Sequence, residues 1–200
     1  MVVTVAAHKG GVGKSTTAVH VAAYLQKKAP TVLVDSDPNR SVCGWAVNGS
    51  LPFEVVPLYQ AARRTREFEH VVVDTNASLG ADEFKEAAAG CDLLIIPTTP
   101  DALSYQSLIL TVELVKTVAS AHYKALLTIV PPKPSRDGEE MRAELITRSI
   151  PLFKTGIRRF VAYQKAALAG VPVYKADDPR AEEPWSDYLS VGKEILRDGK

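Results

Sequence analysis

The stretch VVTVAAHKGGVGKSTTA, residues 2–18, decides the fold of this chain. It places an apolar, β-branched run before a glycine-rich loop and a helical pattern after it, which is the context of a phosphate-binding loop. The glycines let backbone N–H groups approach phosphate oxygens, and the following helix adds the positive end of its dipole. We therefore expect Lys14 to neutralise the β- and γ-phosphates of a nucleotide and the Ser15 hydroxyl to ligate Mg²⁺.

A second lysine, Lys9, precedes Lys14 on the strand side of the loop, and a phosphate-binding loop does not require it. We expect its side chain to project over the bound phosphates. From there it would reach a nucleotide held by a second copy of the chain and stabilise charge in trans, as an arginine finger does. The alternative is a solvated surface lysine.

Outward from the loop, short apolar runs alternate with helical patterns. This alternation predicts an α/β fold: one doubly wound, mostly parallel sheet flanked by helices, in a single domain over residues 1–200. We expect one helix from Asp101 to Ala121, capped by Asp101, whose sheet-facing residues are Leu108, Val112, Val115 and Ala119. The other expected elements are strands at 2–7, 31–35, 70–74, 92–97, 125–130 and 150–153, and helices after the loop, near 139–149 and within 181–196.

The composition is that of a globular protein, with 46% hydrophobic and 24% charged residues and a formal net charge of +1. No signal peptide and no run of roughly 20 apolar residues is visible, so a cytoplasmic protein is expected. Basic residues are concentrated between Lys133 and Lys165, where eight oppose four acidic residues. Cys43 and Cys91 lack the spacing of a metal or redox pair and are expected to be reduced structural thiols.

The segment KGGVGKST resembles the deviant Walker A motif of the ParA/MinD family of P-loop ATPases, whose signature is the first lysine. The resemblance implies ATP and Mg²⁺ as cofactors and an ATP-sandwich homodimer in which Lys9 contacts the other subunit. It also accounts for His8, which stands where an ordinary loop has glycine. Lys9 and Lys14 would then be catalytic, and the nucleotide would be bound by Lys9, Gly10, Gly11, Val12, Gly13, Lys14, Ser15 and Thr16.

Three aspartates follow expected strands, where ligands bind in open parallel sheets: Asp35, Asp37 and Asp74. The segment DSDPN resembles the family's switch I, with Asn39 in place of the usual glutamine. By that resemblance Asp37 orients or activates the attacking water and Asp35 supports the Mg²⁺ shell. Asp74 is the Walker B-like acid. The expected metal residues are thus Ser15, Asp35, Asp37 and Asp74, and turnover should be slow because no strong base is evident.

Two further features match the family. Pro97 and Pro100 correspond to its P-x-x-P turn, expected on the dimer side. In relatives the adenine is held by loops after the later strands, which here correspond to residues 128–134 and 154–160.

The resemblance implies a DNA-partition ATPase of the small ParA type. Its ATP dimer would bind nucleoid DNA without sequence preference, and a ParB-type centromere-binding adaptor would stimulate hydrolysis and release it. Such DNA binding is mostly phosphate neutralisation, and the basic excess supports it. The candidate DNA-binding residues are Lys154, Arg158, Arg159 and Lys165, and the alternative is that these charges form a solvated face.

Three alternatives belong to the same family. A relative that positions a protein cargo on the nucleoid would use the same chemistry. A MinD-like membrane oscillator would need an amphipathic, basic C-terminal helix, and VGKEILRDGK has too few large apolar residues, so no stable membrane association is expected. An iron–sulfur relative would need cysteines that Cys43 and Cys91 do not match.

Overall fold

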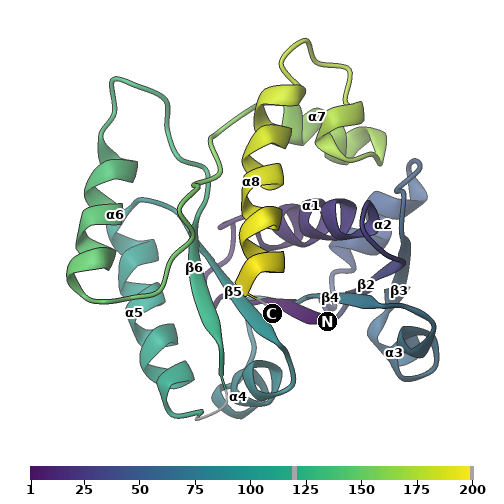
Figure 1. Ribbon diagram of the computed structural model, residues 1–200, viewed down its shortest axis with the longest axis horizontal. Helices are drawn as coiled ribbons and strands as arrows, with labels where there is room; N and C mark the ends of the chain where they lie inside the picture. The colour runs from purple at the N-terminus through teal and green to yellow at the C-terminus, as the bar shows by residue number, and fades with distance from the viewer. Residues whose placement is uncertain (119–120, 199–200) are drawn as a thin grey trace.

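The computed structural model describes residues 1–118 and 121–198, and a six-stranded parallel sheet lies at its centre (Figure 1). The strand order is β3-β2-β4-β1-β5-β6, and every neighbouring pair is parallel. This confirms the predicted fold class. The strands are β1 (Val2–Val5), β2 (Thr31–Asp35), β3 (Glu54–Pro57), β4 (His70–Asp74), β5 (Leu93–Thr98) and β6 (Tyr123–Leu127).

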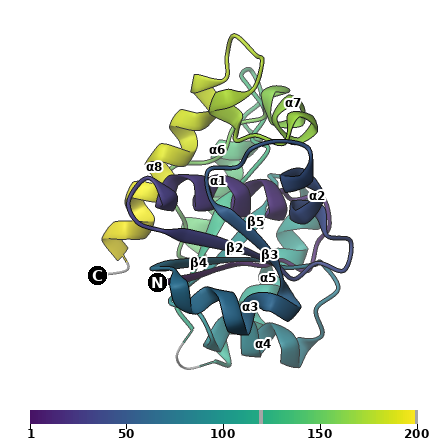
Figure 2. The same cartoon turned by 90° about the vertical axis from the view of Figure 1, so that its right-hand side faces the viewer.

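Helices cover both faces of the sheet, as the parallel connections require. In Figure 2, α1 and α8 lie above the sheet and α3 and α4 below it. The helices are α1 (Lys14–Gln26), α2 (Ser41–Val47), α3 (Leu58–Arg64), α4 (Ala81–Ala89), α5 (Ala102–Lys116), α6 (Asp137–Thr147), α7 (Ala162–Ala169) and α8 (Glu182–Asp198), with short 3₁₀-helices η1 (Thr65–Glu67) and η2 (Val173–Lys175).

Alternate strand residues enter opposite hydrophobic layers. Leu93 and Ile95 of β5 pack with residues of α1, α2, α7 and α8, whereas Leu94 and Ile96 pack with α4, α5 and α6. Both sets of side chains are buried, so the strands are apolar without interruption. This is why their positions could be predicted from the sequence.

Helix α1 is more deeply buried than its predicted apolar stripe requires. Ala18, Val21, Ala22 and Leu25 are buried as expected, but so are Thr17 and His20. The reason is that α8 packs against α1, and residues of α2, α7 and η2 also contact His20. The long C-terminal helix α8 therefore covers part of α1, the helix that follows the phosphate-binding loop (Figure 1).

Helix α5 begins where the sequence predicts. The Asp101 carboxylate accepts a hydrogen bond from the Ser104 backbone N–H, so Asp101 is the N-cap. Leu108, Val112 and Val115 are buried against the sheet, and the helix ends at Lys116. Ala119 lies outside the described residues.

Two strand predictions differ from the structure. The edge strand β3 is absent from the prediction because Glu54–Pro57 has only two β-branched residues and is half-buried. The expected strand at 150–153 is reduced to a single bridge between Ala125 and Leu152.

Candidate functional site

The loop between β1 and α1 has the backbone of an anion-binding loop. Gly11 and Gly13 adopt φ values of 76° and 83°, in the left-handed region that favours glycine. No side chain caps the N-terminus of α1, so the N–H groups of its first turn remain available to a ligand at the loop. The geometry therefore suits the phosphates of a nucleotide.

Lys14 lies inside this loop and is buried. Its Nζ donates to the carbonyl oxygen of Lys9 at 3.0 Å. Burial lowers the pKa of Lys14, while the Asp74 and Asp37 carboxylates raise it. The ammonium is thus held within the loop, where it faces the acidic side of the site and can neutralise phosphate charge.

Asp74, at the end of β4, is the most unusual group of the site. Its side chain is 0% exposed, and neither carboxylate oxygen has a hydrogen-bond partner among the described residues. Burial raises the pKa of Asp74 to about 7; the Asp35 and Asp37 carboxylates add to this rise, whereas the nearby Ser15 hydroxyl and the Lys14 ammonium oppose it. A buried carboxylate without a partner is costly, so this environment calls for a cation.

Mg²⁺ fits this position, because it prefers oxygen ligands and binds through one or two carboxylates, waters and substrate phosphates. Among residues 1–118 and 121–198 there is no cluster of three or more His, Cys, Asp or Glu that could hold a metal ion by itself. Of the four predicted metal residues, Ser15 and Asp74 would therefore hold Mg²⁺ together with phosphate oxygens.

The Asp35 carboxylate accepts backbone hydrogen bonds that the sequence does not predict. Its Oδ2 accepts hydrogen bonds from the backbone N–H groups of Val42, at 3.1 Å, and Cys43, at 2.8 Å. Its Oδ1 accepts from the N–H of Asp37 at 3.1 Å. The carboxylate therefore holds the first turn of α2 and the intervening loop, and its expected support of the Mg²⁺ shell stays a prediction.

Asp35 and Asp74 are brought together as predicted, because they are register partners on adjacent strands. Asp37 lies in the loop after β2, half-buried, and its Oδ1 accepts from the Asn39 N–H at 2.9 Å. Its role toward an attacking water stays a prediction.

Lys9 does not project over the loop as expected from the sequence. Its Nζ donates to Asp101 Oδ1 at 2.9 Å and to Ser104 Oγ at 2.7 Å, both at the start of α5. The reason is the parallel pairing of β1 with β5, which brings the loops that follow these strands together. Its contact with a second subunit stays a prediction.

A cavity of about 710 Å³ begins at the phosphate-binding loop, within the range typical of small-molecule sites. It includes parts of the two loops expected to hold adenine, and it adds residues of α7 and α8 that sequence reasoning missed. The lining residues are Gly13, Thr16, Thr128, Ile129, Pro132, Ile157, Arg158, Arg159, Phe160, Val161, Tyr163, Gln164 and Tyr188.

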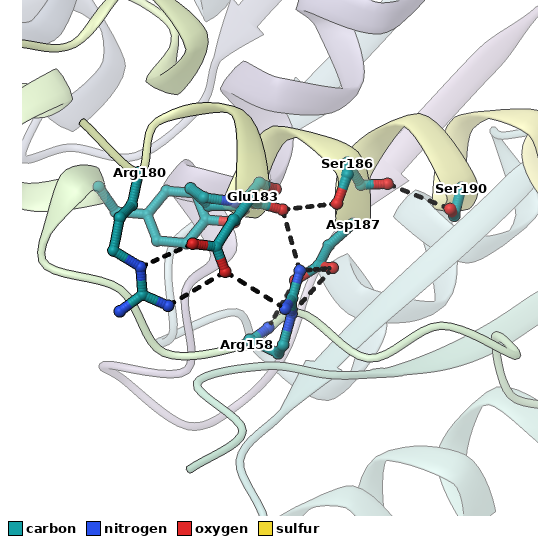
Figure 3. Close-up of polar contacts among 8 residues, drawn as sticks. Arg158, Arg180, Glu183, Ser186, Asp187 and Ser190 are labelled. Carbon is teal, nitrogen blue, oxygen red and sulfur yellow. Dashed lines mark hydrogen bonds and ion pairs between the residues drawn. The ribbon is translucent and has the colours of Figure 1, made fainter. Parts of the chain in front are cut away.

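Arg158, a candidate DNA-binding residue, is engaged within the chain (Figure 3). Its guanidinium donates to both carboxylate oxygens of Asp187 on α8, at 2.9–3.2 Å, and to the Glu183 carbonyl oxygen at 3.1 Å. It also lies over the Phe160 ring, as does the guanidinium of Arg180. Arg158 therefore lines the cavity, and its charge is neutralised by an ion pair with Asp187 of α8.

The other three DNA-binding candidates divide into two kinds. Lys165 forms an ion pair with Asp178 at 2.9 Å. Lys154 and Arg159 are exposed, and within the described part of the chain their side chains make no hydrogen bond or ion pair. The latter two are the candidates whose charge is available to a polyanion.

His20 supports the cavity from beneath and was not singled out from the sequence. The Val173 N–H donates to its Nε2 at 3.0 Å, so Nδ1 carries the proton and donates to the Thr16 carbonyl oxygen at 2.6 Å. The ring stacks on Tyr188 with a centroid distance of 4.8 Å. Burial lowers the pKa of His20 to about 4. The sequence carries no signal for it, because His20 lies outside the predicted apolar stripe of α1, on the opposite face of the helix.

The described helices include none long and apolar enough to cross a bilayer. Helix α8 directs Trp185, Tyr188, Val191 and Ile195 into the core, and Leu196 packs against them. Ile195 and Leu196 therefore pack within the fold.

Comparison with known proteins agrees with this geometry. A relative from Gloeobacter kilaueensis called "Maintenance of carboxysome distribution protein A" is 35% identical, over 98% of this chain and 94% of its own length. "Protein ParA" of Rhizobium radiobacter is 30% identical, over 81% and 80%. A putative plasmid partition protein of Borrelia burgdorferi B31, solved with AMPPNP, has the same fold with a TM-score of 0.74, at 19% identity over 97% and 98%.

The loop, the strand-end carboxylates and every cavity-lining residue except Tyr188 lie within residues 3–173, over which the chain matches a family model described as the CobQ/CobB/MinD/ParA nucleotide binding domain. This match spans more than half of the chain and agrees with the predicted resemblance. The chain therefore belongs to the CobQ/CobB/MinD/ParA family of nucleotide-binding domains.

Proposed function

We propose that this chain is a ParA-type ATPase that positions a protein cargo, with ATP binding and hydrolysis as the timer of its attachment. The observation that carries the ATPase proposal is the partnerless Asp74 carboxylate beside the Lys14 loop. The Asp74 carboxylate and the Lys14 ammonium suit a Mg²⁺–triphosphate. Without bound Mg²⁺, the buried Asp74 carboxylate lacks a partner.

The geometry supports a division of roles among residues of the chain. The N–H groups of the loop and Lys14 bind the phosphates, and Ser15 with Asp74 holds Mg²⁺, which when bound neutralises charge on the transferring phosphoryl group. Asp37 orients the attacking water. Asp35 holds the loop that carries Asp37, through its hydrogen bond with the Asp37 N–H.

A protein cargo is favoured over a centromere by the carboxysome-distribution relative, which matches almost the whole chain. We expect an adaptor on the cargo to stimulate hydrolysis, in the place that a ParB-type adaptor would have in DNA partition. The 30% identical ParA relative supports DNA partition as the second candidate. Both candidates require an ATP-dependent homodimer that binds nucleoid DNA through exposed cations such as Lys154 and Arg159.

The ATPase proposal is tested by phosphate release with Mg²⁺–ATP, for the wild-type chain and for Asp37→Ala. Slow turnover that Asp37→Ala abolishes supports it, and turnover that is equal in both chains contradicts the role of Asp37. Retention on DNA with ATP but not with ADP supports the nucleoid as the matrix.

The two cargo classes are separated in the native host. Deletion of the gene followed by a plasmid-loss assay and by microscopy of protein microcompartments distinguishes them. Clustered or unevenly inherited compartments with normal plasmid retention support a protein cargo, and plasmid loss with normal compartments supports DNA partition.

A further inference from the structure

The contacts of Lys9 form a closed network at the start of α5. Asp101 Oδ1 accepts from Lys9 Nζ at 2.9 Å and from the Ser104 N–H at 2.9 Å. Asp101 Oδ2 accepts from Ser104 Oγ at 2.7 Å and from Thr99 Oγ1 at 2.5 Å. Four donors therefore converge on one carboxylate, and Ser104 contacts both it and the ammonium.

This carboxylate is a stable anion. Burial raises the pKa of Asp101, but the hydrogen bonds from Thr99, Ser104 and Lys9 outweigh this effect and hold the pKa well below its usual range. Asp101 is consequently charged at neutral pH and available to pair with Lys9.

The backbone of Lys9 is fixed while its side chain is movable. Its carbonyl oxygen accepts from Lys14 Nζ at 3.0 Å, which ties residue 9 to the phosphate-binding loop. Its own side chain is 30% exposed, and that of Asp101 is 45% exposed. The ammonium can therefore leave Asp101 by side-chain rotation alone, without any change in the loop.

Asp101 and Ser104 use two of the three N–H donors of the Lys9 ammonium and hold its side chain against the start of α5 in its own chain. We propose that Asp101 and Ser104 are positioning residues that hold Lys9 back in the free chain, so that ATP-driven pairing must first break this contact. We call the contact of Lys9 with Asp101 and Ser104 the Lys9 latch. The inference rests on the proposed ATP-dependent dimer.

The latch sets how readily two chains pair. A partly exposed ion pair of this kind changes an equilibrium by at most about five-fold. Two latches open for each dimer, and the two factors multiply, so removal of both tightens the dimer by up to about 25-fold. An effect of this size restrains pairing without preventing it.

Asp101→Asn is the informative variant, because asparagine is as good an N-cap as aspartate and preserves the start of α5. Asp82→Asn is the matched control: Asp82 lies in the first turn of α4 and pairs with a lysine, as the N-cap Asp101 does at the start of α5, but its side chain is 95% exposed. Lys9→Ala, alone and combined with Asp101→Asn, shows whether the effect passes through Lys9.

The experiment measures the dimer dissociation constant by sedimentation with a non-hydrolysable ATP analogue and Mg²⁺. We expect Asp101→Asn to tighten the dimer by several-fold to about 25-fold, Asp82→Asn to leave it unchanged, and the double variant to behave as Lys9→Ala. Pairing of Asp101→Asn that equals or is weaker than wild type overturns the latch.

A second readout keeps failure of the latch distinct from failure of the dimer. Acylation of lysine amines is followed by mass spectrometry in the nucleotide-free monomer, with exposed Lys116 as internal reference. Lys9 should be labelled faster in Asp101→Asn than in wild type, and equal labelling overturns the latch. If labelling rises but wild type binds the analogue and never pairs, the latch stands and the proposed dimer is wrong.

Discussion

The buried Asp74 carboxylate predicts that the free chain loses stability as the pH rises. The pKa of this group is about 7 in the folded chain, against an ordinary value of 3.8 for an aspartate in water. Between these values the folded chain binds more protons than the unfolded chain, so the free energy of unfolding falls with increasing pH. Asp74→Asn carries no charge at any pH and removes this contribution.

The size of the effect follows from the two pKa values. The lower pKa of Asp74 in the unfolded chain reduces the free energy of unfolding by about 2 kcal/mol at about pH 5 and by about 4 kcal/mol at about pH 8. Relative to Asp74→Asn, the wild-type chain should therefore lose about 2–3 kcal/mol across this range. The absolute stability of the variant does not enter, because only the difference between two pH values is compared.

The assay is urea unfolding at both pH values, with EDTA present and nucleotide absent. Titration of His20 acts in the opposite direction over part of this range, but it is common to both chains and cancels. Asp82→Asn, a substitution at a side chain that is 95% exposed, should follow wild type. Equal pH dependence in wild type and Asp74→Asn would refute the reasoning.

Mg²⁺–ADP provides the complementary measurement. Ligand that binds the folded chain raises its stability by mass action. Added at about pH 8, it should stabilise wild type strongly, because it supplies the cation that the Asp74 carboxylate lacks, and Asp74→Asn only weakly. A stabilisation of equal size in both chains would place the metal elsewhere.

Three further predictions concern the loop, the histidine and the basic residues. Lys14→Ala should weaken ADP binding by at least about 100-fold, since a buried charge–phosphate contact is lost, and calorimetry that shows normal affinity would reject the loop assignment. The wild-type free energy of unfolding should fall by about 3 kcal/mol between about pH 6.5 and about pH 4, because His20 binds a proton in the unfolded chain but not in the folded chain. His20→Gln should remove this fall, and acid unfolding curves that coincide for the two chains would contradict this. Lys154→Glu with Arg159→Glu should lower the salt slope of ATP-dependent DNA binding by about 3.6 for the four cations lost per dimer, and an unchanged slope would show that these cations do not contact DNA.

The sequence alone determines the parallel sheet, the phosphate-binding loop and the order of the strand-end acids. These features are local: an uninterrupted apolar run indicates a buried strand, and glycine at fixed spacing permits the left-handed backbone at Gly11 and Gly13. Parallel topology then brings Asp35 and Asp74 to one edge of the sheet, as predicted.

The roles of individual charges depend on contacts that no local pattern encodes. Asp35 holds the start of α2, Lys9 bonds with Asp101 at a separation of 92 residues, and Arg158 pairs with Asp187 on α8. Each was assigned from the sequence to a ligand or to solvent, because the sequence shows which residues carry charge. Only the packing of the strand-end loops and of α8 decides which opposite charge or backbone N–H lies within reach.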